Sequence, residues 1–503
     1  MSGTAVDEHG VGVLGRRLRA AADVLGLDVP AAEGVPEIDA SIVFGVVVEH
    51  VHRSATPDLW LVLAALTGSL PGHDLVVAAL RQRDLQSAGN FAAWLLEAGH
   101  REALAGHPDA EMEIVTGVVV DVDFSASHDL HTGIQRVVRE TVPRWDAAHD
   151  VVLTAWTPGG GAMRALQGHE ADRVLRWGQV APAVSGGRNT STPPPSTPTL
   201  VVPWRSSVVL LENPRPECCA AIVGMSRFSG NAVSLIGYDC IPALSPELIH
   251  PGLPDRFMRY LEVVKHARTV AGISAAATQE FRGFRDMLGA QGLTGPDVVE
   301  CVLPVAAPPG GDAARSEIPM VVCVGSFEPR KNQLAVLHAA EHLWRSGLVF
   351  ELQFIGGGGW PTEFDLMMRR LLAEGRPVRR RTAVSEEELW SALRGARFSV
   401  FVSLHEGFGL PVAESLACGT PCLTSDFGST REIADGGGAL VVDPRDDLAI
   451  AEQMRRLLTD DDLVEQLTLA ARRRPPRGWD DYAEQLWSLT SPLPIHESTG
   501  ARP

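Results

Sequence analysis

The first part of the chain places apolar residues at i, i+3 and i+4, the spacing of one helix face. We expect helices wherever that spacing persists, at residues 15–28, 57–67, 75–83 and 92–104. Residues 1–110 are therefore predicted to be a domain of about four helices. Their sequence holds no phosphate loop, acid pair or metal cluster. We expect a role in packing or homo-oligomerisation, with acceptor gripping or partner docking as the alternative.

Beyond residue 110 the pattern changes to short, continuous apolar runs that alternate with amphipathic segments. Such runs are typical of strands buried on both faces, as in parallel sheets covered by helices. The predicted strands are 114–122, 151–156, 207–212, 232–238, 320–324, 350–355 and 399–404, and another strand from Val270 leads into a helix capped by Ser274. Predicted helices include 132–141, 386–394, 448–458 and 478–487. The alternation predicts an α/β fold with doubly wound, Rossmann-like sheets.

Two stretches interrupt this pattern. Residues 306–319 are rich in Pro and Gly and poor in apolar residues. We expect them to join two Rossmann-like domains, at 111–307 and 318–475, which a final helix at 476–492 follows. Residues 184–199 are low in complexity and are expected to form a disordered surface loop.

The clearest chemical pattern follows the predicted strand 399–404. The glycine-rich sequence HEGFGL, residues 405–410, precedes Pro411, which suits the first turn of a helix. A strand, a glycine loop and a helix N-terminus together aim backbone N–H groups at an anion. Glu406 and Glu414 can each accept hydrogen bonds from a pair of hydroxyls. Either Glu alone would suit a solvated surface, but the combined pattern favours a ligand with phosphate and sugar hydroxyls, a sugar nucleotide.

A second phosphate-binding loop is predicted after the strand 320–324. Arg330 and Lys331 stand just before a helix, where their charges add to those of the helix-start amides and suit a pyrophosphate. Lys265 and Lys331 are the only lysines of the chain, although arginine is abundant. A lysine retained in this loop indicates a place for a compact ammonium group. The glycine run from Gly356 is not followed by a strand with an acidic end, so a nicotinamide enzyme is not expected.

The sequence Glu406-Gly-Phe-Gly-Leu-Pro, together with Glu414 and the Ala-Cys-Gly-Thr-Pro at 417–421, resembles the donor-site signature of the retaining glycosyltransferases of family 4. The resemblance implies a GT-B fold, in which two Rossmann-like domains face a cleft and the last helix crosses back to the first domain. It implies that Glu406 holds sugar hydroxyls, that Glu414 holds the nucleotide ribose and that the amides of residues 408–410 contact the donor. The all-α N-terminal part lies outside the resemblance.

The resemblance also implies a set of site residues. The catalytic candidates are Glu406, Arg330 and Lys331. The donor-binding candidates are Thr132, Gly133, Gly325, Ser326, Gly356, Gly407, Phe408, Gly409, Leu410 and Glu414, and the weaker acceptor-side candidates are His131, Gln135, Tyr238 and Asp239. Ser326 stands where the family commonly has Arg. Tyr238 stands where many members have His, so it is expected either to line the cleft or to pack at the strand end.

Composition narrows the range of partners. A net charge of −18 over 503 residues argues against a nucleic-acid binder. The seven cysteines form no disulfide framework and the start lacks a basic and then apolar leader, so a cytoplasmic protein is expected. The apolar stretches fall short of the ~18 residues of a membrane span, although Arg136, Arg139 and Arg144 give a weak basis for peripheral membrane contact. Cys418 and Cys422 have no nearby His or second Cys pair, so they are expected to be core residues and not metal ligands. No cofactor is expected.

The predicted reaction is the metal-independent, retaining transfer of a sugar from a nucleoside diphosphate to an acceptor hydroxyl. GDP-mannose, UDP-hexose and dTDP-deoxysugar donors remain open, as do glycan, cell-envelope, lipid and natural-product acceptors. One alternative keeps the fold: a sugar-nucleotide epimerase, or a phosphorylase that would hold pyridoxal phosphate on one of the two lysines. The other alternative is a non-catalytic, sugar-nucleotide-binding scaffold.

Overall fold

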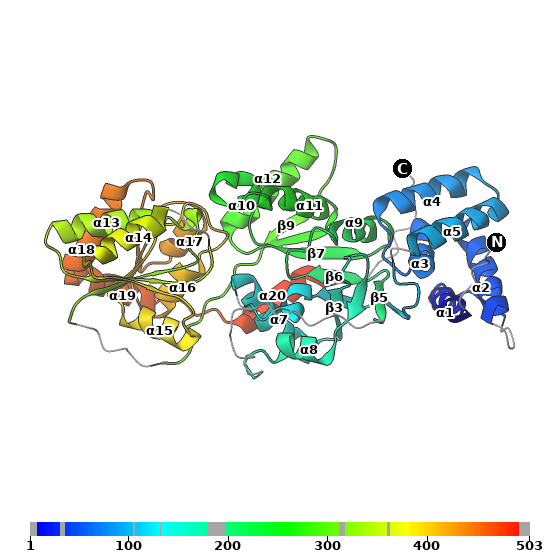
Figure 1. Ribbon diagram of the computed structural model, residues 1–503, viewed down its shortest axis with the longest axis horizontal. Helices are drawn as coiled ribbons and strands as arrows, with labels where there is room; N and C mark the ends of the chain where they lie inside the picture. The colour runs from blue at the N-terminus through cyan, green and yellow to red at the C-terminus, as the bar shows by residue number, and fades with distance from the viewer. Residues whose placement is uncertain are drawn as a thin grey trace.

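The computed structural model describes residues 8–30, 36–103, 106–130, 132–179, 198–310, 317–359 and 363–491. These residues form three parts in a row, shown in Figure 1: a helical N-terminal part and two sheets, each with helices on both faces. The N-terminal helices and the second sheet lie at opposite ends of the row. The loop predicted at 184–199 lies, up to residue 197, outside the described residues.

Within the described residues the N-terminal part has five helices: α1 (Glu8–Val24), α2 (Pro36–Val51), α3 (Thr56–Thr67), α4 (His73–Leu85) and α5 (Ala88–Ala103). The predicted number of about four was wrong because α2 was missed. Its run Ile-Val-Phe-Gly-Val-Val-Val places apolar residues on all sides of the helix. The periodic signal of an amphipathic helix is therefore lost.

The helical part and the first sheet share one hydrophobic core. Trp204 belongs to the first sheet part, and its indole N–H donates to the carbonyl of Pro57 in the helical part at 3.1 Å. A Cβ on Gly224, in helix α9 (Cys219–Phe228), would lie 2.1 Å from the carbonyl oxygen of Pro71. The backbone before α4 therefore packs directly on α9, and the helical part is continuous with the first sheet.

The first sheet has nine strands among the described residues, in the order β1-β5-β4-β3-β2-β6-β7-β8-β9. They are β1 (Met112–Val115), β2 (Val118–Asp121), β3 (Val151–Trp156), β4 (Met163–Ala165), β5 (Leu200–Pro203), β6 (Ser207–Leu210), β7 (Ala232–Gly237), β8 (Thr269–Gly272) and β9 (Asp297–Glu300). β4 is antiparallel to both neighbours and the other pairs are parallel. The prediction of a single strand at 114–122 was wrong. Around Gly117 the chain leaves the edge of the sheet, where β1 lies, and enters its centre as β2.

The helices that accompany this sheet are α6 (Asp123–Ser127), α7 (Gly133–Ala148), α8 (Gly168–Leu175), α9, α10 (Ile241–Leu244), α11 (Leu253–His266) and α12 (Ala275–Gly289). They cover both faces of the sheet, with α7 and α8 on one face and α9 to α12 on the other (Figure 1). As predicted, the Ser274 hydroxyl caps α12, accepting from the N–H of Ala277 at 2.9 Å.

The second sheet has six strands in the part of the chain described after residue 317, all parallel, in the order β12-β11-β10-β13-β14-β15. They are β10 (Met320–Val324), β11 (Glu351–Ile355), β12 (Val378–Arg381), β13 (Phe398–Phe401), β14 (Cys422–Ser425) and β15 (Ala439–Val442). The helices are α13 (Gln333–Arg345), α14 (Glu363–Ala373), α15 (Glu386–Gly395), α16 (Leu410–Ala417), α17 (Gly428–Asp435), α18 (Asp447–Thr459) and α19 (Asp461–Arg472). The strand order reverses between β10 and β13. Ligands of such sheets bind beyond the carboxyl ends of the strands at this switch point.

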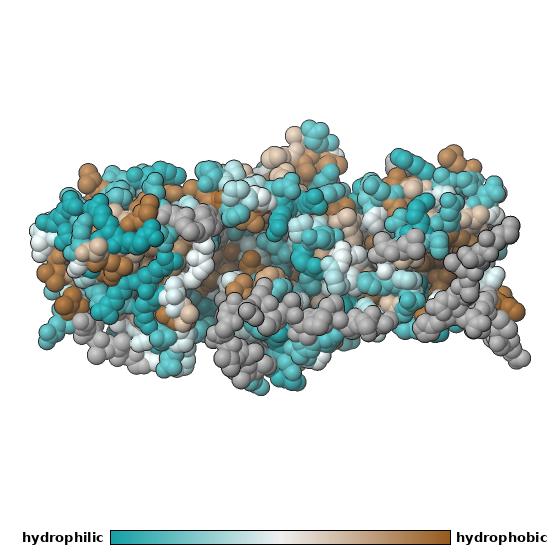
Figure 2. Space-filling view, in the orientation of Figure 1, coloured by the Kyte–Doolittle hydropathy of each residue, from teal (hydrophilic) through white to brown (hydrophobic). Residues whose placement is uncertain are grey.

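The last described helix, α20 (Trp479–Thr490), returns from the second sheet to the first. It packs on α7, where the Trp145 indole N–H donates to the carbonyl of Ala483 at 2.9 Å and the Trp145 and Trp487 rings meet edge to face. The face of the molecule in Figure 2 is largely hydrophilic over the second sheet, and apolar residues lie in a recess where the two sheet parts meet. Among the described helices, none combines the length and the apolar character that crossing a bilayer requires.

Candidate functional site

The loop between β13 and α16 lies at the switch point of the second sheet and faces the first. Gly409 adopts a left-handed φ of 107° and caps α16, which starts at Leu410 with Pro411 in its first turn. A Cβ on Gly407 would lie 2.2 Å from the carbonyl oxygen of Tyr238 in the opposite sheet part. Both glycines are therefore required by the backbone, one by its conformation and one by a close approach.

Glu406 lies at the centre of a buried charge cluster. Its Oε1 accepts from Lys331 Nζ at 2.6 Å and its Oε2 from Arg330 Nη1 at 3.1 Å. Arg330 also pairs with Glu328 at 2.9 Å, and the Ser326 hydroxyl donates to Glu328 at 2.6 Å. The structure thus brings the three catalytic candidates together. Ser326, where the resembled family commonly has Arg, here orients a carboxylate.

The cations of this cluster keep Glu406 ionised. Burial alone would raise the pKa of Glu406, but the charges of Lys331 and Arg330 outweigh that effect and hold the pKa below its ordinary value. The side chain of Glu406 is 9% exposed and that of Lys331 10%. Lys331 Nζ also lies 5.0 Å from the centre of the Phe401 ring. The compact ammonium that the sequence indicated is therefore held between a carboxylate and an aromatic face.

The glycines that end β10 and β11 touch each other through the backbone. Gly325 donates its N–H to the carbonyl of Ile355 at 2.9 Å. A Cβ on Gly356 would lie 2.0 Å from the carbonyl oxygen of Gly325, and both glycines have positive φ angles, 146° and 159°. A side chain at position 356 would therefore push the two strand ends apart, whereas a Cβ on Gly325 would lie in ordinary contact, 3.7 Å from the Lys331 and Phe401 side chains.

Glu414, on α16, has a different partner. Its Oε1 accepts from Arg136 Nη1 of α7 at 2.7 Å, so an ion pair joins the two sheet parts. Burial raises the pKa of Glu414, and Arg136 offsets only part of that rise. The two carboxylates of the signature are therefore held by separate cations, Glu406 within the second sheet part and Glu414 from the first.

The start of α7 forms the opposite wall. A Cβ on Gly133 would lie 2.9 Å from Leu410 Cδ1, so the first turns of α7 and α16 face each other. Thr132 caps α7, and the Gln135 side chain accepts from the Thr132 N–H at 3.2 Å and from its hydroxyl. Gln135 is buried and completes this capping box rather than facing an acceptor. His131 lies outside the described residues.

The side chains of the two remaining acceptor-side candidates, Tyr238 and Asp239, point in different directions. The Tyr238 hydroxyl donates to the carbonyl of Leu211 at 2.7 Å in the interior of the first sheet part, so this side chain packs at the strand end. Asp239 accepts from the N–H of Ile241 at 3.1 Å and lies close enough to Arg330 for their charges to interact. Burial raises the pKa of Asp239, and Arg330 opposes that rise. Asp239 is thus the one of these two that borders the charge cluster.

Comparison with known proteins identifies the family of the segment that carries this site. Residues 312–474 match the family model described as "Glycosyl transferases group 1". This segment is a group 1 glycosyltransferase domain. It contains the Glu406 cluster, Glu414 and the glycine loops, so the resemblance seen in the sequence is confirmed.

Curated relatives extend the match beyond the group 1 glycosyltransferase domain. The serotype-specific mannosyltransferase WbdA of Escherichia coli is 25% identical over 339 residues, 63% of this chain and 38% of the relative. The O-antigen chain mannosyltransferase B of Escherichia coli is 34% identical over 142 residues, 27% of this chain and 36% of the relative. A D-inositol 3-phosphate glycosyltransferase of Xylanimonas cellulosilytica is 33% identical over 175 residues, 33% of this chain and 41% of the relative. The chain thus spans well under half the length of these relatives.

Solved structures define the fold around the group 1 glycosyltransferase domain. The sucrose-phosphate synthase of Thermosynechococcus elongatus superposes with a TM-score of 0.52 at 15% identity, over 75% of this chain and 98% of that one. Anabaena HepE, solved in complex with UDP and glucose, superposes with a TM-score of 0.50 at 10% identity, over 74% and 98%. With two Rossmann-like sheets facing each other and a helical N-terminal part, the predicted GT-B architecture is confirmed.

Sequence reasoning missed the polar contacts that hold the group 1 glycosyltransferase domain against the first sheet part. His405 bonds to Glu280 at 2.7 Å and to the Ser245 hydroxyl at 2.8 Å. Burial would lower the pKa of His405, but the bond to Glu280 raises it above its ordinary value. The Ser274 hydroxyl donates to the carbonyl of Gly407 at 2.6 Å. The position of His405, next to Glu406, was the one available signal in the sequence.

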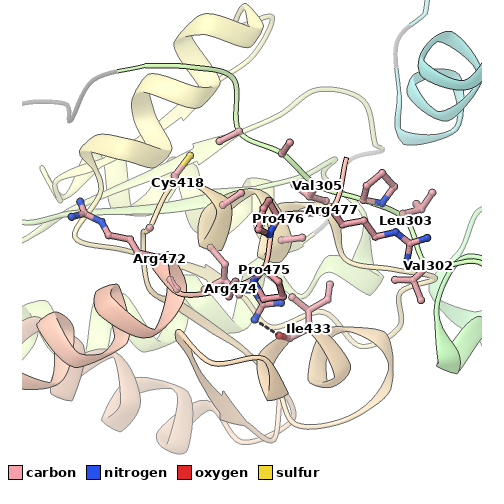
Figure 3. A pocket seen from close by; sticks show the side chains of 18 of the residues that line it. Val302, Leu303, Val305, Cys418, Ile433, Arg472, Arg474, Pro475, Pro476 and Arg477 are labelled. Atoms are coloured by element: carbon pink, nitrogen blue, oxygen red, sulfur yellow. Dashed lines mark hydrogen bonds between the residues drawn. The ribbon is translucent and has the colours of Figure 1, made fainter. Parts of the chain in front are cut away.

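Two of the cavities lined by described residues lie between the group 1 glycosyltransferase domain and the first sheet part. One, of about 370 Å³, is lined by His405, Glu406, Ser245 and Glu280 at the junction of the two sheet parts. A larger one, of about 720 Å³, lies behind α16 between the two segments that cross from one sheet part to the other. Figure 3 shows that its arginines do not converge: Arg474 donates to the carbonyl of Ile433, while Arg472 and Arg477 extend elsewhere. The smaller cavity is therefore the one associated with the signature carboxylate.

Two further expectations concern metals and membranes. No group of three or more His, Cys, Asp or Glu side chains suited to a metal ion occurs in the part of the chain that the structure describes. Membrane contact stays a prediction, and the structure gives it little basis in these three arginines. Arg139 is buried and donates to backbone carbonyls, Arg136 pairs with Glu414, and Arg144 makes a surface ion pair with Asp480.

Proposed function

We propose that this chain is a retaining glycosyltransferase that moves a sugar from a nucleoside diphosphate to an acceptor hydroxyl, without a metal ion, in the synthesis of a glycan or cell-envelope polymer. The observation that carries the proposal is the buried pairing of Glu406 with Lys331 and Arg330 below the first turn of α16. It supplies an ionised carboxylate, two cations and helix-start amides within one site, opposite the first turn of α7.

Each group has a distinct part in the proposed reaction. Glu406 accepts hydrogen bonds from sugar hydroxyls near the reacting carbon and holds the ring in place. Lys331, Arg330 and the amides at the start of α16 stabilise the charge that grows on the diphosphate as the glycosidic bond breaks. The acceptor hydroxyl attacks from the face that the diphosphate leaves, and an oxygen of the leaving phosphate takes its proton. Contact between the two sheet parts keeps water from hydrolysing the donor.

A mannosyl donor is the first to test. Two of the relatives described above are named mannosyltransferases, and the third is named for transfer to an inositol phosphate. The chain matches only part of the length of each relative, so the nucleotide base, the sugar and the acceptor are proposed and have to be tested. Glu414, which can accept from two vicinal hydroxyls, favours a ribonucleotide over a deoxyribonucleotide.

The test starts from the donor, because it needs no knowledge of the acceptor. The purified chain is screened by thermal shift against GDP, UDP, ADP and dTDP. It is then incubated with GDP-mannose or UDP-glucose and a set of hydroxyl-bearing acceptors while diphosphate release is followed. We expect one diphosphate to raise the melting temperature and the matching donor to be consumed. Glu406→Gln should lower turnover by about 10²-fold or more while the variant still melts cooperatively.

Two results would overturn the proposal. If no diphosphate stabilises the chain, the site does not bind a sugar nucleotide. If the donor is converted to an epimeric sugar without release of diphosphate, as NMR of the products would show, the chain is a sugar-nucleotide epimerase. Normal turnover by Glu406→Gln would separately refute the role given to this carboxylate.

A further inference from the structure

Arg136 joins the two sheet parts where the donor ribose is proposed to bind. Its guanidinium donates to the carboxylate of Glu414 at 2.7 Å, across 278 residues of sequence. The side chains of Arg136 and Glu414 are 18% and 8% exposed. The same guanidinium lies 5.8 Å from the centre of the Trp390 ring. A buried carboxylate of one sheet part therefore has its cation supplied by the other.

This pairing competes with the role proposed for Glu414. A carboxylate that holds two vicinal hydroxyls accepts on both oxygens, and the hydrogen bond from Arg136 uses part of the acceptor capacity of Oε1. Without a donor, the ion pair is needed, because a buried charge that loses its partner is strongly unfavourable. With a donor, the ribose hydroxyls can replace the hydrogen bond from Arg136, and the guanidinium then requires another anionic partner.

The diphosphate of the same donor is the partner within reach. Arg136 lies one turn after the start of α7, where Gly133 faces Leu410 at the start of α16. Both helix starts direct backbone N–H groups into the space between them, which suits phosphate. The cations of the Glu406 cluster are already paired with that carboxylate. Arg136 can add a planar, bidentate donor to a phosphate without breaking that cluster.

We propose that Arg136 is the donor-responsive cation of this site: it neutralises Glu414 before the donor binds, and it transfers to the diphosphate when the ribose occupies Glu414. The inference rests on the proposed function. Arg136 is then a specificity residue, because a nucleoside displaces it from Glu414 and offers it no phosphate in return. A nucleoside diphosphate does both, so the exchange favours complete nucleotides over nucleosides.

The test compares nucleotides with nucleosides on the full chain. Calorimetric titration measures the affinities of GDP, UDP and ADP, and of guanosine, uridine and adenosine, for the wild type and for Arg136→Gln. We expect Arg136→Gln to weaken binding of the preferred diphosphate by about tenfold or more and to leave binding of the matching nucleoside unchanged or stronger. Arg136→Lys should fall between the two proteins, because it keeps the charge and loses the fork.

Arg144→Gln is the matched control. Arg144 lies two turns further along α7 and makes a surface ion pair to Asp480 of α20, so both affinities should stay at the wild-type values. The inference fails if Arg136→Gln and Arg136→Lys weaken diphosphate and nucleoside by the same factor, which is the mark of a structural role, or if they change neither. If the wild type binds no diphosphate at all, the proposed function fails first and this inference with it.

Discussion

Replacing Lys331 by Met tests whether the charge cluster holds the loop that carries Glu406. The methionine keeps the length of the side chain and removes its charge, so Glu406 stays buried with Arg330 alone, at 3.1 Å. Removing one partner of a buried pair costs about 3–5 kcal/mol. We expect about 3 kcal/mol, the lower end of that range, because Arg330 remains in place. For a domain of this size each kcal/mol lowers the melting temperature by about 2–4 °C, so the expected shift is about 6–12 °C.

Scanning calorimetry of the full chain measures this shift, and a matched variant controls for it. Arg370→Met removes an exposed i,i+4 pair with Glu374 in the same sheet part and should cost at most about 0.5 kcal/mol. The double variant Lys331→Met/Glu406→Gln should be more stable than the sum of its single changes by about 2 kcal/mol, since the two changes together remove both members of one buried ion pair. If Lys331→Met lowers the melting temperature no more than Arg370→Met does, the ion pair of Lys331 with Glu406 does not stabilise the loop and the reasoning is refuted.

Three further predictions concern single positions. His405→Ala should lower the melting temperature more at about pH 6 than at about pH 9. The pKa of His405 is higher in the folded chain than in the unfolded chain, so the stability it gives is fully present below the unfolded pKa and is lost as the pH rises through the folded pKa. An equal loss at both pH values would refute this. Gly407→Ala should abolish donor binding and lower the free energy of unfolding by about 1–3 kcal/mol, because the added Cβ meets the Tyr238 carbonyl oxygen. The control Gly283→Ala has open space around the added Cβ and should raise the free energy of unfolding by about 0.5–1 kcal/mol in a thermal melt. Asp121, whose pKa burial and the nearby Asp123 charge raise to about 8, makes the wild type lose stability from about pH 4 to pH 8, where the unfolded chain ionises first; Asp121→Asn should flatten that slope in melts across the range, and an unchanged slope would contradict the assignment.

The sequence predicted best those elements whose cause is local. The loop from β13 into α16 was predictable because glycine, glycine and proline each answer a backbone requirement within a few residues, and Gly409 does adopt a left-handed φ. The capping residue Ser274 was found for the same reason. Elements were missed where the local signal is weak: α2 is apolar on all sides, and β1 and β2 form one continuous apolar run that a two-residue break divides.

The composition of the site could be predicted from the sequence, but its pairings could not. Arg330, Lys331 and Glu406 were expected in one site because both loops suit a donor diphosphate and the resemblance assigns both to the donor, and the three residues are in contact. The partner of Glu414 lies 278 residues away on another sheet part, and no periodicity or motif connects two such positions. Tyr238 shows the same limit, because its direction depends on the carbonyl of Leu211, which only the packed sheet brings into reach.

The contacts between the two sheet parts bear on when the site is complete. They concentrate on residues 405–410: Gly407 packs on the Tyr238 backbone and accepts from Ser274, His405 bonds to Glu280, and Leu410 meets Gly133. A loop held by so many groups from the opposite part takes its shape from them as well as from its own strand and helix. Separation of the two parts would therefore release the backbone on both sides of Glu406. Glu406 keeps its cations within the second sheet part, so we expect closure of the two sheet parts to fix the backbone of its loop and to bring Arg136 to Glu414, as well as to enclose the site.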